Sequence, residues 1–253
     1  MTTALSPVVV ARLEKAATDN GFDQELEREG DWLVFASTHS SLRVWLGMSG
    51  EAFLAALSQQ NVARALDGGG APMPVTFPKG AVGGRAVNGV PALYALLRRA
   101  YQLSKALPNE LLHTFDKQTA SLPRATEAER LVIQRVGQDV FRAGLMDYWD
   151  GHCAVTGLAV PELLRASHVK PWAECDTDAE RLDVFNGLLL APHLDAAFDA
   201  GLITVGDDGV VIVSYSLGAE ARDILGLKDV LRVQMIADGH RSYLAYHRER
   251  VFR

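Results

Sequence analysis

Apolar residues recur every three or four positions in several parts of the chain, the spacing that places them on one face of a helix. One such stretch covers residues 8–18 and ends near Asn20-Gly21, a pair typical of helix ends. The same spacing returns at residues 49–66 and 90–106. The pattern therefore predicts three helices in the first 106 residues.

Residues 31–37 and 42–47 follow a different pattern. Both runs are short and rich in β-branched and aromatic side chains, and the polar stretch Thr38-His39-Ser40-Ser41 separates them. This arrangement predicts a β-hairpin. Glycines crowd residues 68–72 and 80–84, which predicts a loop-rich stretch between the second and third helices.

The periodicity breaks at residues 119–126, a small, polar segment that contains Pro123. Such a composition is typical of interdomain linkers. Thr126 and Glu129 then have the spacing of a capping box, which predicts a helix from about residue 127 toward Trp149. We therefore divide the chain into an amino-terminal domain of residues 1–118, a linker of residues 119–126 and a carboxyl-terminal domain of residues 127–253.

The composition is that of a soluble globular protein, because 48% of the 253 residues are hydrophobic and no apolar run approaches the roughly 20 residues that span a bilayer. The first seven residues lack the basic-then-apolar order of a signal peptide, so we expect a cytoplasmic protein without a membrane partner. Cys153 and Cys175 are the two cysteines, and neither has C-x-x-C spacing. A disulfide framework and a structural zinc knuckle are therefore not expected.

The net charge of −6 argues against a protein that coats DNA without specificity, since Lys and Arg supply most of that affinity. A local basic face is still compatible with this charge. Cationic side chains gather on the helix predicted for residues 90–106 and near the carboxyl terminus: Arg98, Arg99, Lys105, Arg232, Arg241, Arg248, Arg250 and Arg253. Ordinary solvated surface charge is the alternative interpretation.

Residues 151–204 contain the motifs that bear on chemistry. The segment Ala166-Ser167-His168-Val169-Lys170-Pro171-Trp172 is followed by Asn186-Gly187-Leu188-Leu189-Leu190-Ala191-Pro192 and then by Phe198-Asp199-Ala200-Gly201-Leu202-Ile203. This order resembles the HNH, or ββα-metal, endonuclease family, in the branch found at the carboxyl terminus of bacterial restriction-type endonucleases. The resemblance implies a β-hairpin and a helix around one metal ion, so we expect an α+β protein: a mixed α+β domain followed by a helical domain that contains this nuclease module.

The resemblance also implies roles for individual residues. His168, near the end of the first strand, matches the general base, and an imidazole with a pKa of about 6.5 can accept a proton at cellular pH. Asn186 matches the residue that holds the loop between hairpin and helix and so orients the base. Asp195, nine residues later, stands at the metal-facing position of the helix. His193 is the alternative ligand, but two positions on a helix differ by about 200°, so both are not expected to bind one ion.

Three departures from the family pattern affect these expectations. Asp195 replaces the final His, which favours Mg²⁺ or Mn²⁺ over zinc because hard cations prefer carboxylate oxygen. Ser167 replaces an Asp that many members place before the base, so weak metal binding without DNA is expected. Of the cysteine pairs that bind structural zinc in relatives, only Cys153 remains, and we expect it as a buried residue of the first strand. Asp199 is expected to be a structural hydrogen-bonding partner.

Contacts with nucleic acid are expected from four basic residues, Lys170, Arg165, Arg248 and Arg250. An isolated HNH module grips the backbone and reads little sequence. The amino-terminal domain is therefore expected to recognise a DNA site or a modified base. Trp32, Phe35 and Trp45 could form an aromatic pocket for a flipped base, although aromatic side chains in strands are more often core residues.

Together these features favour a Mg²⁺- or Mn²⁺-dependent DNA endonuclease, related to restriction or defence against foreign DNA. Two other functions are kept open: a DNA-binding or sensor protein in which the nuclease fold is a scaffold without activity, and an RNA nuclease or toxin. Two nicks on opposite strands need two active sites or two visits. A homodimer would meet that need by symmetry, and the sequence leaves the oligomeric state open.

Overall fold

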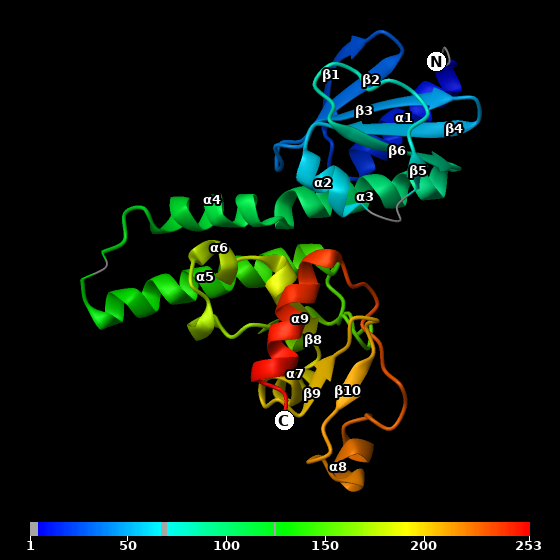
Figure 1. The fold of residues 1–253 in the computed structure, drawn as a ribbon. Coiled ribbons are helices and arrows are strands. Elements are labelled where there is room, and N and C mark those ends of the chain that lie inside the picture. Colours follow the sequence, from blue (N-terminus) through cyan, green and yellow to red (C-terminus); the bar gives the residue numbers. More distant parts are fainter. Residues whose placement is uncertain (1–4, 67–69, 124) are drawn as a thin grey trace. The chain divides into compact units, whose positions relative to one another are not determined.

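The computed structural model in Figure 1 describes residues 5–66, 70–123 and 125–253. Parts of the predicted loop at residues 68–72 and of the linker at residues 119–126 therefore lie outside the described residues, as do residues 1–4. The chain divides into two compact units between Lys105 and Ala106, which groups the helix before the predicted linker with the second unit. In the described segments, no helix combines the length and apolarity that a membrane crossing requires.

The first unit is built on an antiparallel six-stranded sheet with the order β1-β2-β3-β4-β6-β5 (Figure 1). Two of the predicted helices and the predicted hairpin are confirmed, because the second and third strands pair antiparallel. The elements of this unit are α1 (Pro7–Asp19), β1 (Gln24–Glu29), β2 (Trp32–Ala36), β3 (Val44–Ser49), β4 (Ala52–Leu57), α2 (Gln60–Ala65), β5 (Ala71–Pro72), β6 (Gly83–Asn88) and α3 (Val90–Ala106).

The prediction of one helix over residues 49–66 is wrong for its first part, which forms a strand. Residues 52–57 form β4, and only residues 60–65 are helical. β4 pairs with β3 on one side and with β6 on the other, and Phe53 to Leu57 are all at most 5% exposed. Alanine and leucine favour helices, but two ladders of hydrogen bonds and burial on both faces outweigh that weak preference.

The aromatic side chains of the first sheet lie in its core. Trp32, Phe35 and Trp45 are 7%, 1% and 1% exposed. Trp45 stands opposite Val34 on one neighbouring strand and Ala56 on the other, so these side chains share one face of the sheet. The hypothesis of an aromatic pocket open to a flipped base is therefore contradicted.

The second unit combines helices with two small antiparallel sheets, so it is mixed rather than mainly helical. Its long helices α4 and α5 lie side by side (Figure 1). β7 and β8 form a hairpin, with His168 opposite Gly187, and α7 follows directly. The elements are α4 (Pro108–Thr119), α5 (Glu127–Tyr148), η1 (Pro161–Leu163), β7 (Arg165–His168), η2 (Trp172–Glu174), α6 (Asp178–Arg181), η3 (Val184–Asn186), β8 (Gly187–Leu190), α7 (Pro192–Asp199), β9 (Ile203–Val205), β10 (Val211–Val213), α8 (Ala219–Ile224) and α9 (Asp238–Arg250).

The predicted capping box at the start of α5 is confirmed. The Thr126 side chain accepts a hydrogen bond from the Glu129 backbone, and the Glu129 carboxylate accepts one from the Thr126 backbone at 2.8 Å. The second half of α5 buries Phe141 and Leu145 against the β7–β8 hairpin. The cap therefore defines where the helix that supports the hairpin begins.

Replacing the capping side chain tests this start point. We expect Thr126→Ala to lower the free energy of unfolding by about 1 kcal/mol, because the first turn of α5 loses an acceptor for an unpaired backbone N–H. Urea unfolding followed by circular dichroism measures the change. The exposed Thr114→Ala in the middle of α4 is the control and should not destabilise, since alanine is the better helix former. Equal stability of the two variants would contradict the role of the cap.

Candidate active site

His168 is the last residue of β7, and its ring is held from two sides. The ring stacks on Phe141 of α5 with 3.8 Å between the ring centroids, and Trp172 meets it edge-on at 5.4 Å. The residue lines a cavity of about 380 Å³ together with Ser167, Asp199 and others. The β7–β8 hairpin, the helix α5 and the loop after β7 thus fix the imidazole beside a space that a ligand can enter.

The hydrogen bond of the ring determines which nitrogen carries the proton. Nε2 of His168 lies 2.8 Å from the carbonyl oxygen of Arg181. A carbonyl can only accept, so Nε2 must donate, and Nδ1 of the neutral ring keeps its lone pair. Burial lowers the pKa of His168 to about 4, although the Arg181 carbonyl raises it. The imidazole is therefore neutral at pH 7 and able to accept a proton on Nδ1.

Asn186 is fully buried just before β8 and ties together the loop that joins the two strands. Its Oδ1 accepts a hydrogen bond from the Lys170 backbone at 2.7 Å. Its Nδ2 donates to the carbonyls of Lys170 and Glu180 at 3.3 and 3.2 Å. Asn186 thus acts within the hairpin, not between hairpin and helix as the sequence predicted. It holds the residue next to Arg181, whose carbonyl orients His168.

The close packing of α5 explains why a glycine, Gly187, follows Asn186. The residue is extended within β8, so the pair is not a turn. A Cβ at Gly187 would lie 2.5 Å from a ring carbon of Phe141 and 2.8 Å from a methyl carbon of Leu145. Only glycine allows α5 to pack this closely against the hairpin, and this approach brings Phe141 under the His168 ring.

Two carboxylates of α7 lie on the same face of the helix, because Asp195 and Asp199 are four residues apart. Ser167 of β7 donates a hydrogen bond to Asp199 at 3.3 Å, so Asp199 reaches the residue next to the candidate base. Although Asp199 is exposed at the cleft surface, nearby protein shields its carboxyl enough to raise the pKa, and the charge of Asp195 raises it further. His193 is exposed in the first turn, about 200° around the helix from Asp195.

His247 is a residue of this cavity that sequence reasoning missed. It comes from α9, is 1% exposed, and stacks on Phe198 at 3.8 Å. Its Nε2 lies 3.3 Å from the Phe198 carbonyl and its Nδ1 lies 2.9 Å from the Thr204 hydroxyl. Burial lowers its pKa to about 4. Nothing near His247 in the sequence signals that it packs against the residue preceding Asp199.

Cys153 lies in a turn before η1, not in a strand as predicted. It is fully buried and is a free thiol, as is Cys175. The sulfur accepts hydrogen bonds from the backbone N–H groups of Thr156 and Ala191 at 3.4 and 3.3 Å. Since Ala191 is the N-cap of α7, the thiol connects this turn to the helix that carries the two carboxylates.

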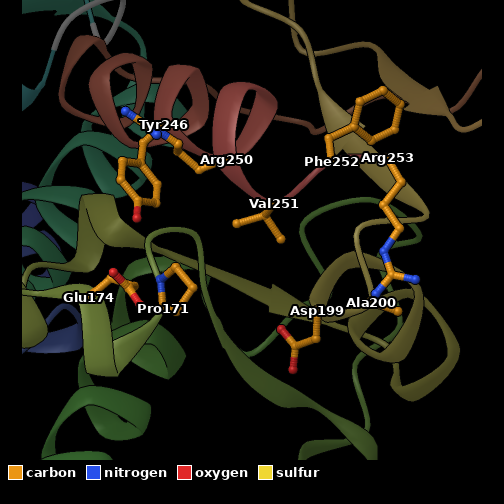
Figure 2. Close-up of a pocket in the computed structure, with 9 residues that line it drawn as sticks. All are labelled: Pro171, Glu174, Asp199, Ala200, Tyr246, Arg250, Val251, Phe252 and Arg253. Carbon is orange, nitrogen blue, oxygen red and sulfur yellow. The ribbon is translucent and has the colours of Figure 1, made fainter.

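Three of the four basic residues expected at nucleic acid bond within the protein. The Lys170 ammonium lies 2.8 Å from Glu180 and is 14% exposed, and this hydrogen bond raises its pKa. Arg165 donates to backbone carbonyls of the preceding turn at 3.1 Å. Arg248 donates to the Val205 carbonyl and to an aspartate, both at 2.8 Å. Arg250 differs, because it lines a second cleft (Figure 2).

Comparison with known proteins identifies this part of the chain. Residues 153–206 match the model of the HNH endonuclease family, which confirms the family resemblance for this segment. The match includes the β7–β8 hairpin, α7 and the residues His168, Asn186, Asp195 and Asp199. A search of curated proteins found no match. The HNH endonuclease domain in the carboxyl-terminal half of the chain points to a nuclease.

Removal of the Asn186 amide tests its contribution to the site. Asn186→Ala leaves the Lys170 N–H and two part-buried carbonyls without this partner, so we expect a loss of about 3 kcal/mol in the free energy of unfolding. Chemical unfolding measures it. Asn109→Ala, an exposed position on α4, is the matched control and should change stability by less than about 0.5 kcal/mol. An Asn186→Ala protein as stable as this control would show that the loop does not depend on the amide.

The two buried histidines predict how stability depends on pH. His168 and His247 titrate at about 4 in the folded chain and at about 6.5 when exposed. The unfolded chain therefore binds more protons as pH falls below 6.5, so stability falls between about pH 6.5 and 4. Urea unfolding at pH 7.5, 6 and 5 measures the decline. His247→Phe, which keeps an aromatic ring, should make it shallower; an unchanged decline would argue against a buried neutral His247.

Proposed function

We propose that this protein is a divalent-metal-dependent DNA endonuclease in which His168 activates the water that attacks a phosphodiester bond. The observation that carries the proposal is the hydrogen bond from His168 Nε2 to Arg181, within a segment that matches the HNH endonuclease family. It leaves Nδ1 as an acceptor on a ring that lines a cavity. Phosphodiester hydrolysis requires a base of this kind and a cation to offset charge on the phosphate.

The environment of His168 suits a base that works only when substrate is present. Burial keeps the imidazole neutral in the free protein. A phosphate that enters the cavity brings negative charge close to the ring, and a nearby negative charge raises the pKa of a histidine. Substrate binding would therefore make Nδ1 a stronger base at the moment when it must take a proton from water.

Asp195 and Asp199 are the residues that we propose to hold the metal ion. They offer oxygen donors on one face of α7. Burial raises the pKa of Asp199 most, and the charge of Asp195 raises it further, so a divalent cation between the two carboxylates would offset that repulsion. This donor set fits Mg²⁺ or Mn²⁺. When bound, the cation neutralises charge on the phosphate and on the departing oxygen. Asp199, expected from sequence to be structural, is a better partner for Asp195 than His193, which lies on another side of the helix.

The protein provides few ligands for this ion. No group of three or more His, Cys, Asp or Glu side chains suited to a metal occurs among the residues that the structure describes. Water and phosphate oxygens would complete the coordination, which agrees with the weak metal binding expected from Ser167. Ser167 itself donates to Asp199 and would orient that carboxylate toward the cavity that it shares with His168.

Target choice is proposed to lie with the amino-terminal part, residues 1–118 in the sequence division. Backbone contacts position a nuclease without specifying sequence, so a separate element must select the site. The first unit has its own antiparallel sheet and core, as an independent recognition domain requires. We propose that it reads a DNA sequence or a base modification, in a restriction or defence role, and that two copies of the chain act together on duplex DNA.

Loss of the base and loss of the ligands should differ in their effects. We expect His168→Ala to lower the rate of plasmid cleavage in Mg²⁺ by about 10² to 10⁴-fold at every metal concentration, since the variant lacks the imidazole that takes the proton from water. Asp195→Asn and Asp199→Asn should instead raise the Mg²⁺ concentration needed for half-maximal rate. His193→Gln is the matched control on α7 and should cleave normally. Cleavage by His168→Ala at the wild-type rate would refute the assignment.

The same assay separates the alternative functions. Unmodified, methylated and hydroxymethylated DNA are offered side by side with RNA, in Mg²⁺ and in Mn²⁺. Binding of DNA without cleavage of any of these substrates would indicate a scaffold that has lost activity. Cleavage of RNA alone would indicate an RNA nuclease.

A further inference from the structure

A second cleft, of about 820 Å³, adjoins the His168 cavity. Figure 2 shows the residues that line this cleft. The two spaces share Pro171, Asp199 and Val251 in their linings, so a ligand in one can extend into the other. One wall of the larger cleft comes from the end of α9 and the residues that follow it, including Arg250 and Arg253. Any strand that reaches His168 past Asp199 would pass this wall.

Arg250 and Arg253 differ from most arginines of the second unit, whose guanidinium groups bond to other parts of the protein. Arg142 donates to two carbonyls at 2.7 Å, and Arg222 donates to two others at 2.7 and 2.8 Å. Arg248, on the same helix as Arg250, pairs with Asp207. Among the described residues, neither the Arg250 nor the Arg253 guanidinium makes a hydrogen bond or an ion pair. Their charge is available to a ligand.

The backbone that carries Arg253 is fixed in place. The Arg253 N–H donates to the Gly201 carbonyl at 3.0 Å, and Ser214 donates to the Arg253 carbonyl at 2.6 Å. Gly201 has a φ of +68°, and a Cβ there would overlap the carbonyl oxygen of Val251. The segment after α9 therefore lies directly on the turn that ends α7, two residues from Asp199. The backbone at Arg253 therefore needs no further ordering when the side chain binds an anion.

The two guanidinium groups are directed differently. Figure 2 shows them on opposite sides of Val251, with the Asp199 carboxylate below the segment between them. They are therefore arranged to meet different phosphates, not to enclose one. The carboxylates of Glu174 and Asp199 lie on other parts of the lining and would repel an anion, so the arginines set where phosphates can lie.

We infer that Arg250 and Arg253 form a binding site for the sugar-phosphate backbone of DNA, each contacting a separate phosphate near the bond that is cut. The inference rests on the proposed function, because it takes the ligand of the cleft to be the strand that reaches His168. Contacts of this kind position the strand and carry no sequence information. The site therefore strengthens binding to all duplexes equally.

Salt dependence of DNA binding tests this site without cleavage. Affinity for two duplexes of unrelated sequence is measured in EDTA across a range of salt, for wild type, Arg250→Gln, Arg253→Gln and the double variant. Each lost phosphate contact should reduce the slope of log K against log salt by about 0.9, and the double variant should lose about 1.8 on both duplexes. Arg241→Gln is the matched control, because Arg241 lies on α9 but bonds to Asp238 and to the Asp207 carbonyl.

The outcomes separate this site from the proposed activity. A double variant with the slope and affinity of Arg241→Gln would overturn the inference, and so would a loss confined to one of the two duplexes. Restoration of the slope by Arg250→Lys and Arg253→Lys would show that charge, not folding, was lost. DNA binding that depends on both arginines, in a protein that never cuts DNA, would support the site and refute the nuclease assignment. DNA cleavage by a protein whose DNA binding does not depend on the two arginines would support the nuclease assignment and overturn this site.

Discussion

The hydrogen bond between His168 Nε2 and the Arg181 carbonyl is the contact on which the chemistry of the site depends. It selects one tautomer of a neutral imidazole, and the surrounding elements keep both partners in place. Phe141 stacks on the ring, which is possible because Gly187 lets α5 approach the hairpin. Asn186 bonds the Glu180 carbonyl, adjacent to the acceptor. These contacts together hold the His168 ring and the Arg181 carbonyl in the arrangement that places the proton on Nε2.

The helix α7 organises the opposite side of the same cavity. Its two carboxylates would attract a cation, whereas Arg250 at the end of α9 and Arg253 after it would attract phosphate. His247 connects these parts, because its side chain bonds the Phe198 carbonyl beside Asp199 while its own carbonyl accepts the N–H groups of Val251 and Phe252. Acidic and basic groups are therefore held near each other without pairing. Such a separation suits a site that must bind a cation and a polyanion together.

Much of this arrangement could be predicted from sequence where the signal is local. The order of motifs around His168 and Asn186 predicted the hairpin and the following helix, and Thr126 with Glu129 predicted where α5 begins. Prediction from sequence failed where contacts between residues far apart in the chain determine the secondary structure or the site. Residues 52–57 form a strand because β3 and β6 lie on either side of it. His247 packs on a residue 49 positions away. Asp199 does accept a hydrogen bond, as expected, but the sequence did not indicate that its donor is Ser167, 32 residues earlier. Pattern and spacing carry no information about such pairs.

The most direct test of this account is ¹⁵N NMR of the His168 imidazole in the full chain at pH 7, assigned by comparison with the His168→Gln spectrum. We expect a neutral ring with the proton on Nε2 and a lone pair on Nδ1. A proton on Nδ1 alone, or an imidazolium with both nitrogens protonated, would contradict it, because neither form could act as the base in the orientation that the structure shows.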